Sequence, residues 1–170
     1  MTSARVLVTL ATFMIVGLQI ALFTQWRFGG VVVFIIWLWP VAVGLTGVTS
    51  LALFSGVLAG VLFDAQTATP FGLSALVGLA LGYMSSRLGK EGVGDLDSAA
   101  WWVTPTIAAA AGGAAPLFYV ISGVVAWDFS LWRGSLVNSM VVNAVAFFVL
   151  SRPLTRLALA LCAPAMKVRR

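Results

Sequence analysis

Six long apolar stretches fill most of this chain, and their length limits the possible fold more than any other feature. They cover residues 6–25, 31–47, 49–63, 71–87, 100–125 and 134–151. A helix needs about 20 largely apolar residues to cross a bilayer, and these stretches approach or exceed that length. Because 61% of the 170 residues are hydrophobic and 9% are charged, little remains for a soluble domain. The sequence predicts an all-α integral membrane protein with one transmembrane domain over residues 1–170, built as a six-helix bundle.

Two features of the first half bear on the number of spans. The first stretch is too long for the apolar core of a signal peptide and no A-x-A site follows it, so we expect it to be retained as a span. The second and third stretches are short and poorly separated, because "WPVAVGLTGVTS", residues 39–50, holds a proline, two glycines and several hydroxyl residues but no charge. Pro40 is expected to kink or end the second helix. An alternative with five spans, in which these two stretches form one broken helix, stays open at this point.

The basic residues favour six spans with both termini in the cytoplasm. That topology leaves only Arg27 and Arg133 outside, as the positive-inside rule expects, whereas five spans would force one basic end outward. The basic residues it places inside are Arg5, Arg87, Lys90, Arg152, Arg156, Lys167, Arg169 and Arg170. Residues 152–170 then form a cytoplasmic basic tail. This tail either continues the sixth helix or lies as a short helix on the inner leaflet, where its basic end favours anionic lipids.

Small residues recur every four positions on the third and fourth expected helices. The two stripes are Ala52, Gly56, Gly60 and Asp64, and Ser74, Gly78, Gly82 and Ser86. Such stripes let helix backbones approach closely. Because a short turn joins the two helices, we expect the stripes to face each other or another helix of the bundle, with a second protein as the alternative. Gly17 and Ala21 form a weaker example on the first helix.

The sixth stretch carries a group of polar residues, of which Asn143 lies deepest in the apolar part. The group consists of Ser135, Asn138, Ser139 and Asn143. A buried amide needs a hydrogen-bond partner, and bonding between helices is the expected explanation. A polar ligand pocket is the alternative.

The stretch "GVLAGVLFDAQTATPFGLSAL", residues 56–76, places Asp64 at the outer end of the third helix. One interpretation is that its carboxylate caps backbone amides at the turn or at the start of the fourth helix. The other is functional, since a charged residue within an apolar span marks a candidate site. Pro70 is expected in the first turn of the fourth helix, and Gly72 is expected to permit a close approach of the backbone.

A motif within this stretch resembles the signature of the rod shape-determining protein MreD family. It consists of Gly56, Gly60, Asp64, Pro70, Phe71, Gly72, Leu73, Ala75 and Leu76. The resemblance implies a fold similar to the substrate-binding subunits of energy-coupling-factor transporters. It also implies a non-enzymatic scaffold of the cell-elongation machinery for peptidoglycan synthesis in the bacterial inner membrane. The direct partner would be a MreC-like protein, with RodA, a class B penicillin-binding protein and MreB reached indirectly.

For the site, the resemblance implies that six motif residues shape the outer half of the bundle or dock a partner. They are Gly56, Gly60, Asp64, Pro70, Phe71 and Gly72.

Other functional classes fit the sequence less well. The chain has no histidine, a single cysteine (Cys162) and no glycine-rich phosphate loop, so we expect no catalytic, cofactor or metal residues. The net charge of +5 comes from scattered residues that set orientation, which argues against nucleic acid. A vitamin-like binding subunit of an energy-coupling-factor transporter is the alternative. Its candidate ligand-binding residues are Gln19, Gln25, Asp64, Gln66, Asn138 and Asn143.

Overall fold

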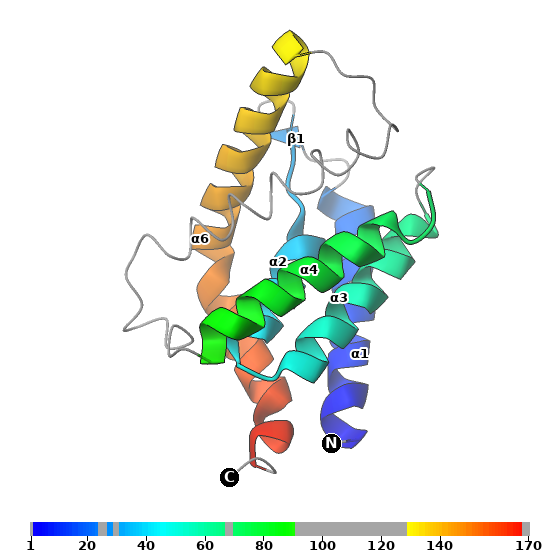
Figure 1. Ribbon diagram of the computed structural model, residues 1–170, viewed down its shortest axis with the longest axis vertical. Coiled ribbons are helices and arrows are strands. Elements are labelled where there is room, and N and C mark those ends of the chain that lie inside the picture. The colour runs from blue at the N-terminus through cyan, green and yellow to red at the C-terminus, as the bar shows by residue number, and fades with distance from the viewer. Residues whose placement is uncertain (1, 24–26, 29–30, 67–69, 91–128, 168–170) are drawn as a thin grey trace.

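The computed structural model describes residues 2–23, 27–28, 31–66, 70–90 and 129–167, and this part of the chain is mostly helical (Figure 1). In order, the elements are α1 (Thr2–Leu18), the π-helical turn η1 (Gln19–Phe23), β1 (Arg27–Phe28), β2 (Val31–Val32), α2 (Ile35–Leu45), α3 (Thr49–Asp64), α4 (Leu73–Leu88) and α6 (Phe129–Lys167). The prediction of a helical protein is confirmed. The expected fifth span, residues 100–125, lies outside the described residues.

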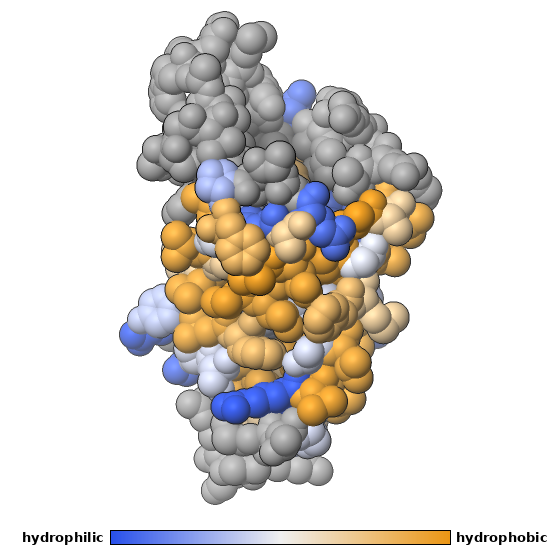
Figure 2. All heavy atoms as spheres, turned by 90° about the vertical axis from the view of Figure 1, so that its right-hand side faces the viewer, coloured by the Kyte–Doolittle hydropathy of each residue, from blue (hydrophilic) through white to orange (hydrophobic). Residues whose placement is uncertain are grey.

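Two helical segments of the described chain are long and apolar enough to cross a membrane, Ser3–Leu22 and Phe148–Met166. Only 22% and 28% of their most apolar windows is buried, so most of their apolar surface faces outward, unlike that of a core helix in a soluble protein. Figure 2 shows the result on one side of the molecule, a broad hydrophobic band with hydrophilic residues toward its edges. The helices α2, α3 and α4 have 11, 16 and 16 residues and are shorter than a full crossing.

The expected second helix begins later than the sequence indicated. Val31 and Val32 are extended and pair antiparallel with Arg27 and Phe28, because β-branched residues favour extended backbone. The helix α2 starts only at Ile35 and is about 16 Å long. Of the two effects expected of Pro40, a kink or the end of the helix, the second is wrong, since α2 continues past Pro40 to Leu45.

The second and third expected helices are separate elements, α2 and α3. A turn at residues 46–48 joins them, and within it the amide of Gly47 donates to the carbonyl of Gly44 at 2.8 Å. Gly47 has a φ of 76°, a left-handed conformation that glycine adopts without steric cost. The chain reverses here, and α3 returns along α2 and α4 (Figure 1).

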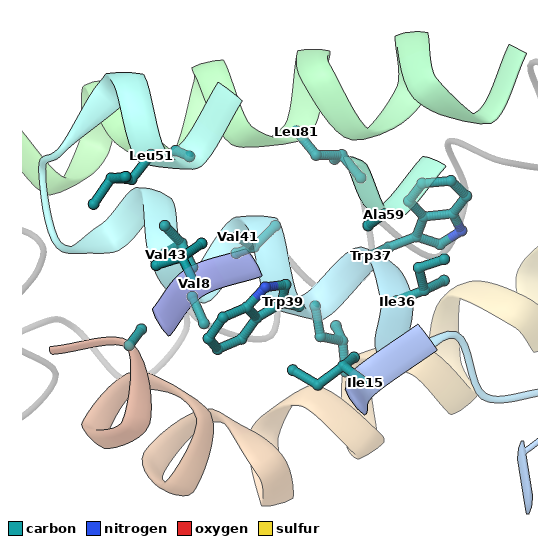
Figure 3. Packing of buried hydrophobic residues seen from close by; sticks show 14 of the residues in the cluster. Val8, Ile15, Ile36, Trp37, Trp39, Val41, Val43, Leu51, Ala59 and Leu81 are labelled. Atoms are coloured by element: carbon teal, nitrogen blue, oxygen red, sulfur yellow. The ribbon is translucent and has the colours of Figure 1, made fainter. Parts of the chain in front are cut away.

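The short helix α2 forms the centre of the bundle, and every one of its residues is buried. It contacts α1, α3, α4 and α6. Figure 3 shows Trp39 beside Val8 of α1, while Trp37 extends toward Ala59 of α3. Trp37 also meets Phe63 edge-on, with ring centroids 6.1 Å apart. Two large aromatic side chains from one short helix therefore fill the space between the outer helices.

The helix α6 is a single element of 39 residues, about 58 Å long. It continues through Pro153 to Lys167, so the tail belongs to the sixth helix and the alternative of a separate helix on the inner leaflet is wrong. Ala158 and Cys162 near its end belong to the same buried core as Ala4 of α1. This packing offsets the backbone hydrogen bond that a proline removes. The start of α1 and the end of α6 lie at the same end of the molecule (Figure 1).

Candidate functional site

Asp64 is the last residue of α3, and its carboxylate faces the start of α4. The side chain is only 3% exposed. Its Oδ2 accepts a hydrogen bond from the amide of Gly72 at 2.8 Å, and the amide of Ser74 donates to Oδ2 and Oδ1 at 3.1 and 3.2 Å. Gly72 is the N-cap of α4, so these are amides that a helix start leaves without intrahelical partners. The negative charge also suits the positive end of the helix dipole. The capping interpretation is therefore confirmed.

The roles expected for Gly72 and Pro70 were wrong in detail. A Cβ built on Gly72 would meet nothing within 4 Å, so no close approach of the backbone requires a glycine here. The left-handed backbone at this position, with a φ of 97°, is what favours glycine, because residues with a side chain disfavour that conformation. Pro70 lies two residues before the cap instead of in the first turn of α4, and its carbonyl accepts from the amide of Leu73 at 3.2 Å. The two residues therefore shape the turn that brings the α4 amides to Asp64.

The turn leaves apolar side chains uncovered beside the buried carboxylate. Phe71 is 72% exposed, and Leu76 one turn into α4 is 56% exposed. Pro70 is exposed as well. An exposed aromatic ring is a typical anchor for a protein or membrane contact.

Glycines of the two small-residue stripes bring α3 and α4 into backbone contact. A Cβ on Gly56 would collide with the carbonyl of Gly78, and a Cβ on Gly78 would collide with that of Gly56. A Cβ on Gly82 would lie 2.6 Å from the carbonyl oxygen of Ala52. The expectation that the stripes face each other is confirmed. This face is filled within the chain and is closed to a second protein.

A second close contact joins α2 to α4, and the sequence analysis missed it. A Cβ on Gly44 would collide with the side chain of Ser85. A Cβ on Gly89 would lie 2.6 Å and 2.7 Å from the carbonyl oxygens of Leu45 and Gly44. Gly44 and Gly89 do not fall on the four-residue stripes, and the available signal was only that each is a glycine near a helix end. The helix α4 is therefore in close contact with both α2 and α3.

Two buried amides hold the backbone where α2 begins. Asn143 Oδ1 of α6 accepts from the amide of Phe34 at 2.8 Å. Gln19 Nε2 donates to the carbonyl of Val33 at 3.1 Å, and its Oε1 accepts from the amide of Ile36 at 3.4 Å. Both side chains are at most 1% exposed. The expected bonding of Asn143 between elements is confirmed, and its partner is backbone at the start of α2.

The remaining polar candidates do not join this pair. Asn138 and Gln66 are exposed. Gln25 and the side chains of Ser135 and Ser139 lie outside the described residues. Of the set suggested for a small ligand, the structure brings together Gln19 and Asn143 alone among described side chains, and places both against backbone.

Two further polar groups lie deeper in the core. Trp39 Nε1 donates to Thr12 Oγ1 at 3.0 Å, which in turn donates to the carbonyl of Val8 at 2.7 Å. The indole N–H of Trp37 has no acceptor among the described residues. The bond between Trp39 and Thr12 ties α1 to α2, so the first helix is an integral part of the core.

The described residues contain no group of three or more His, Cys, Asp or Glu side chains that could hold a metal ion. Around Asp64, a charged cap, a left-handed glycine and close glycine contacts join α3 to α4 in a hairpin, and Phe71 lies exposed beside them. No family model, no curated protein and no solved structure matches this chain.

Proposed function

We propose that this protein is a non-enzymatic scaffold subunit of the bacterial cell-elongation complex, a member of the MreD family. It would bind a MreC-like protein in the inner membrane. Through that protein it would support the peptidoglycan synthase formed by RodA and a class B penicillin-binding protein, alongside MreB filaments. The proposal includes a bundle of six membrane spans, similar to the substrate-binding subunits of energy-coupling-factor transporters, with both termini in the cytoplasm.

One observation carries the proposal, namely the use that the chain makes of Asp64. Its carboxylate is buried and accepts hydrogen bonds from the amides of Gly72 and Ser74. The carboxylate therefore stabilises the start of α4 and does not face a substrate. A general acid or base has to reach the group that reacts. The motif residues thus serve shape, which favours a docking element over an enzyme.

The tip of the hairpin is the natural contact for the partner. Phe71 of the motif is 72% exposed, and it precedes α4, which packs against α3 by backbone contact at Gly56 and Gly78. An aromatic side chain has few rotatable bonds, so it binds with little loss of conformational entropy. We therefore assign the contact with the MreC-like protein to Pro70 and Phe71.

The alternative is a vitamin-like binding subunit of an energy-coupling-factor transporter. It would need polar groups that converge on a ligand. The convergence of Gln19 and Asn143 is the observation in its favour, and their bonds to the backbone of residues 33–36 weaken it.

The test is recovery of partners from native membranes in mild detergent, comparing the wild-type protein with Phe71→Ser and a matched control. The control is Met84→Ser, because Met84 is 64% exposed on α4 away from the tip. We expect Phe71→Ser to lose the MreC-like protein while it accumulates normally, and Met84→Ser to retain it. Equal recovery with all three proteins would contradict docking at the tip. Recovery of an ATPase pair with a transmembrane coupling subunit would favour the transporter.

A further inference from the structure

An apolar groove runs along the outer face of α6 beside the start of α2. Its volume is about 400 Å³, and its lining includes Val33 and the stripe Val141, Val145 and Val149. The three stripe valines are 55%, 60% and 66% exposed. The α6 part of the groove covers residues 141–150, about 14 Å of helix. That length is about half the hydrocarbon thickness of a bilayer, which corresponds to a single leaflet.

Two arginines extend the same face of α6 beyond the groove. Arg152 follows Val149 by three positions and Arg156 follows Arg152 by four, so all lie on one side of the helix. Both are exposed and lie just past the groove, toward the end of α6. No hydrogen bond or ion pair joins either guanidinium to another described residue. A guanidinium at the boundary of an apolar helix face is stabilised by a negatively charged group.

We infer that this face of α6 binds an anionic phospholipid, with an acyl chain in the valine groove and the phosphate on Arg152 and Arg156. Guanidinium groups match phosphate oxygens in paired, charge-assisted hydrogen bonds. Clusters of basic residues beside membrane helices attract anionic headgroups. The apolar groove and the basic pair are continuous, so one amphipathic molecule satisfies both.

The valine groove and the two arginines follow one another along α6 in the same order as the acyl chains and the headgroup of a phospholipid. The arginines lie on the side of the groove nearer the end of α6, which is also the end where α1 begins (Figure 1). A lipid in the leaflet at that end has its headgroup toward the arginines and its chains pointing away, along Val149, Val145 and Val141. An acidic polypeptide would satisfy the arginines but would leave the groove without a specific occupant. This inference does not depend on the proposed function.

The test measures lipid retention by the purified full-length protein with native mass spectrometry. Delipidated protein is supplied with phosphatidylglycerol or phosphatidylcholine of identical acyl chains. We expect preferential retention of phosphatidylglycerol, and loss of that preference by roughly fivefold for each arginine replaced in Arg152→Gln/Arg156→Gln. The matched control is Arg5→Gln, because Arg5 is exposed on α1 away from the groove, and it should keep the wild-type preference.

A second pair of variants tests the groove itself. Val145→Trp fills the groove and should lower retention of both lipids, whereas Val6→Trp, at a site 53% exposed on α1, should not. Arg152→Lys/Arg156→Lys keeps the charge without the planar fork and should retain part of the preference, which guards against misfolding of the glutamine variant.

Four outcomes would overturn the inference. The first is equal retention of both lipids by the wild-type protein. The second is unchanged retention by Val145→Trp. The third is equal thermal stabilisation by soluble glycerol phosphate, which would show a phosphate site without the groove. Loss of a protein partner from the glutamine variant, with lipid retention intact, would assign the arginines to an acidic polypeptide and likewise reject the lipid.

Discussion

The carboxylate of Asp64 accepts a hydrogen bond from the amide of Gly72 at 2.8 Å, which joins the last residue of α3 to the cap of α4. The left-handed backbone of Gly72 sets the path by which the chain enters α4, and Asp64 also reaches the amide of Ser74. The aspartate and the glycine of the motif are therefore parts of one capping device. Neither residue explains the turn without the other.

Replacing Asp64 with alanine should lower the free energy of unfolding by about 2 kcal/mol, because buried amides at a helix start lose their acceptor. Asp64→Asn keeps one acceptor but loses the charge, so we expect a smaller loss of about 1 kcal/mol. Denaturation of the purified protein by SDS measures both. Gln66→Ala, at an exposed position of the same turn, is the control. An unchanged midpoint for Asp64→Ala would contradict the capping role.

Gly72→Ala should destabilise the hairpin by about 1–2 kcal/mol, the usual cost of left-handed backbone for a residue with a side chain. The cost is torsional alone, since a methyl group would meet no atom within 4 Å. Gly72→Asn should therefore cost less than Gly72→Ala, because asparagine tolerates this conformation. Thermal unfolding in detergent ranks the two variants. The reverse order would show that packing governs this position.

Gly56→Ala should be strongly destabilising, by about 1–3 kcal/mol or more, because its methyl group collides with backbone of Gly78 that cannot yield. Gly17→Ala provides a matched control on α1, where an added Cβ meets nothing within 4 Å. That change should be neutral or slightly stabilising, since alanine favours helix. Fluorescence-detected size-exclusion chromatography during heating compares them. Similar stability of the two variants would mean that α3 and α4 are not in backbone contact.

Asn143→Leu should lower stability by about 1–2 kcal/mol, because the amide of Phe34 loses its acceptor. Asn138→Leu is the control, since Asn138 is exposed on the same helix. Combining Asn143→Leu with Gln19→Leu should give a non-additive loss, because both amides hold the backbone of residues 33–36. Urea or SDS unfolding of the three variants gives the coupling. Strict additivity would indicate that the two amides act independently.

Several features of the fold could be predicted from local sequence because local chemistry causes them. The four-residue repeat of Gly56 and Gly60 placed small residues on one face of a helix, and the repeat of Gly78 and Gly82 gave α4 a matching face. With only a short turn between them, the two faces were expected to meet each other or another helix, and the structure shows that they meet each other. Capping was one of two interpretations of Asp64, suggested by an acidic side chain near the start of the next helix.

The sequence by itself therefore determined that this is a helical protein with long apolar segments, and which faces of α3 and α4 pack together. Only the tertiary structure decided that Val31 and Val32 are extended, that α2 is short and central, and that α6 continues past Pro153. The physical reason is that apolar composition shows only that a segment is removed from water. It does not show in which direction the segment runs or which other segment it packs against. In each of these cases the outcome depends on contacts with distant residues, such as those of Gln19 and Asn143 with the backbone before α2.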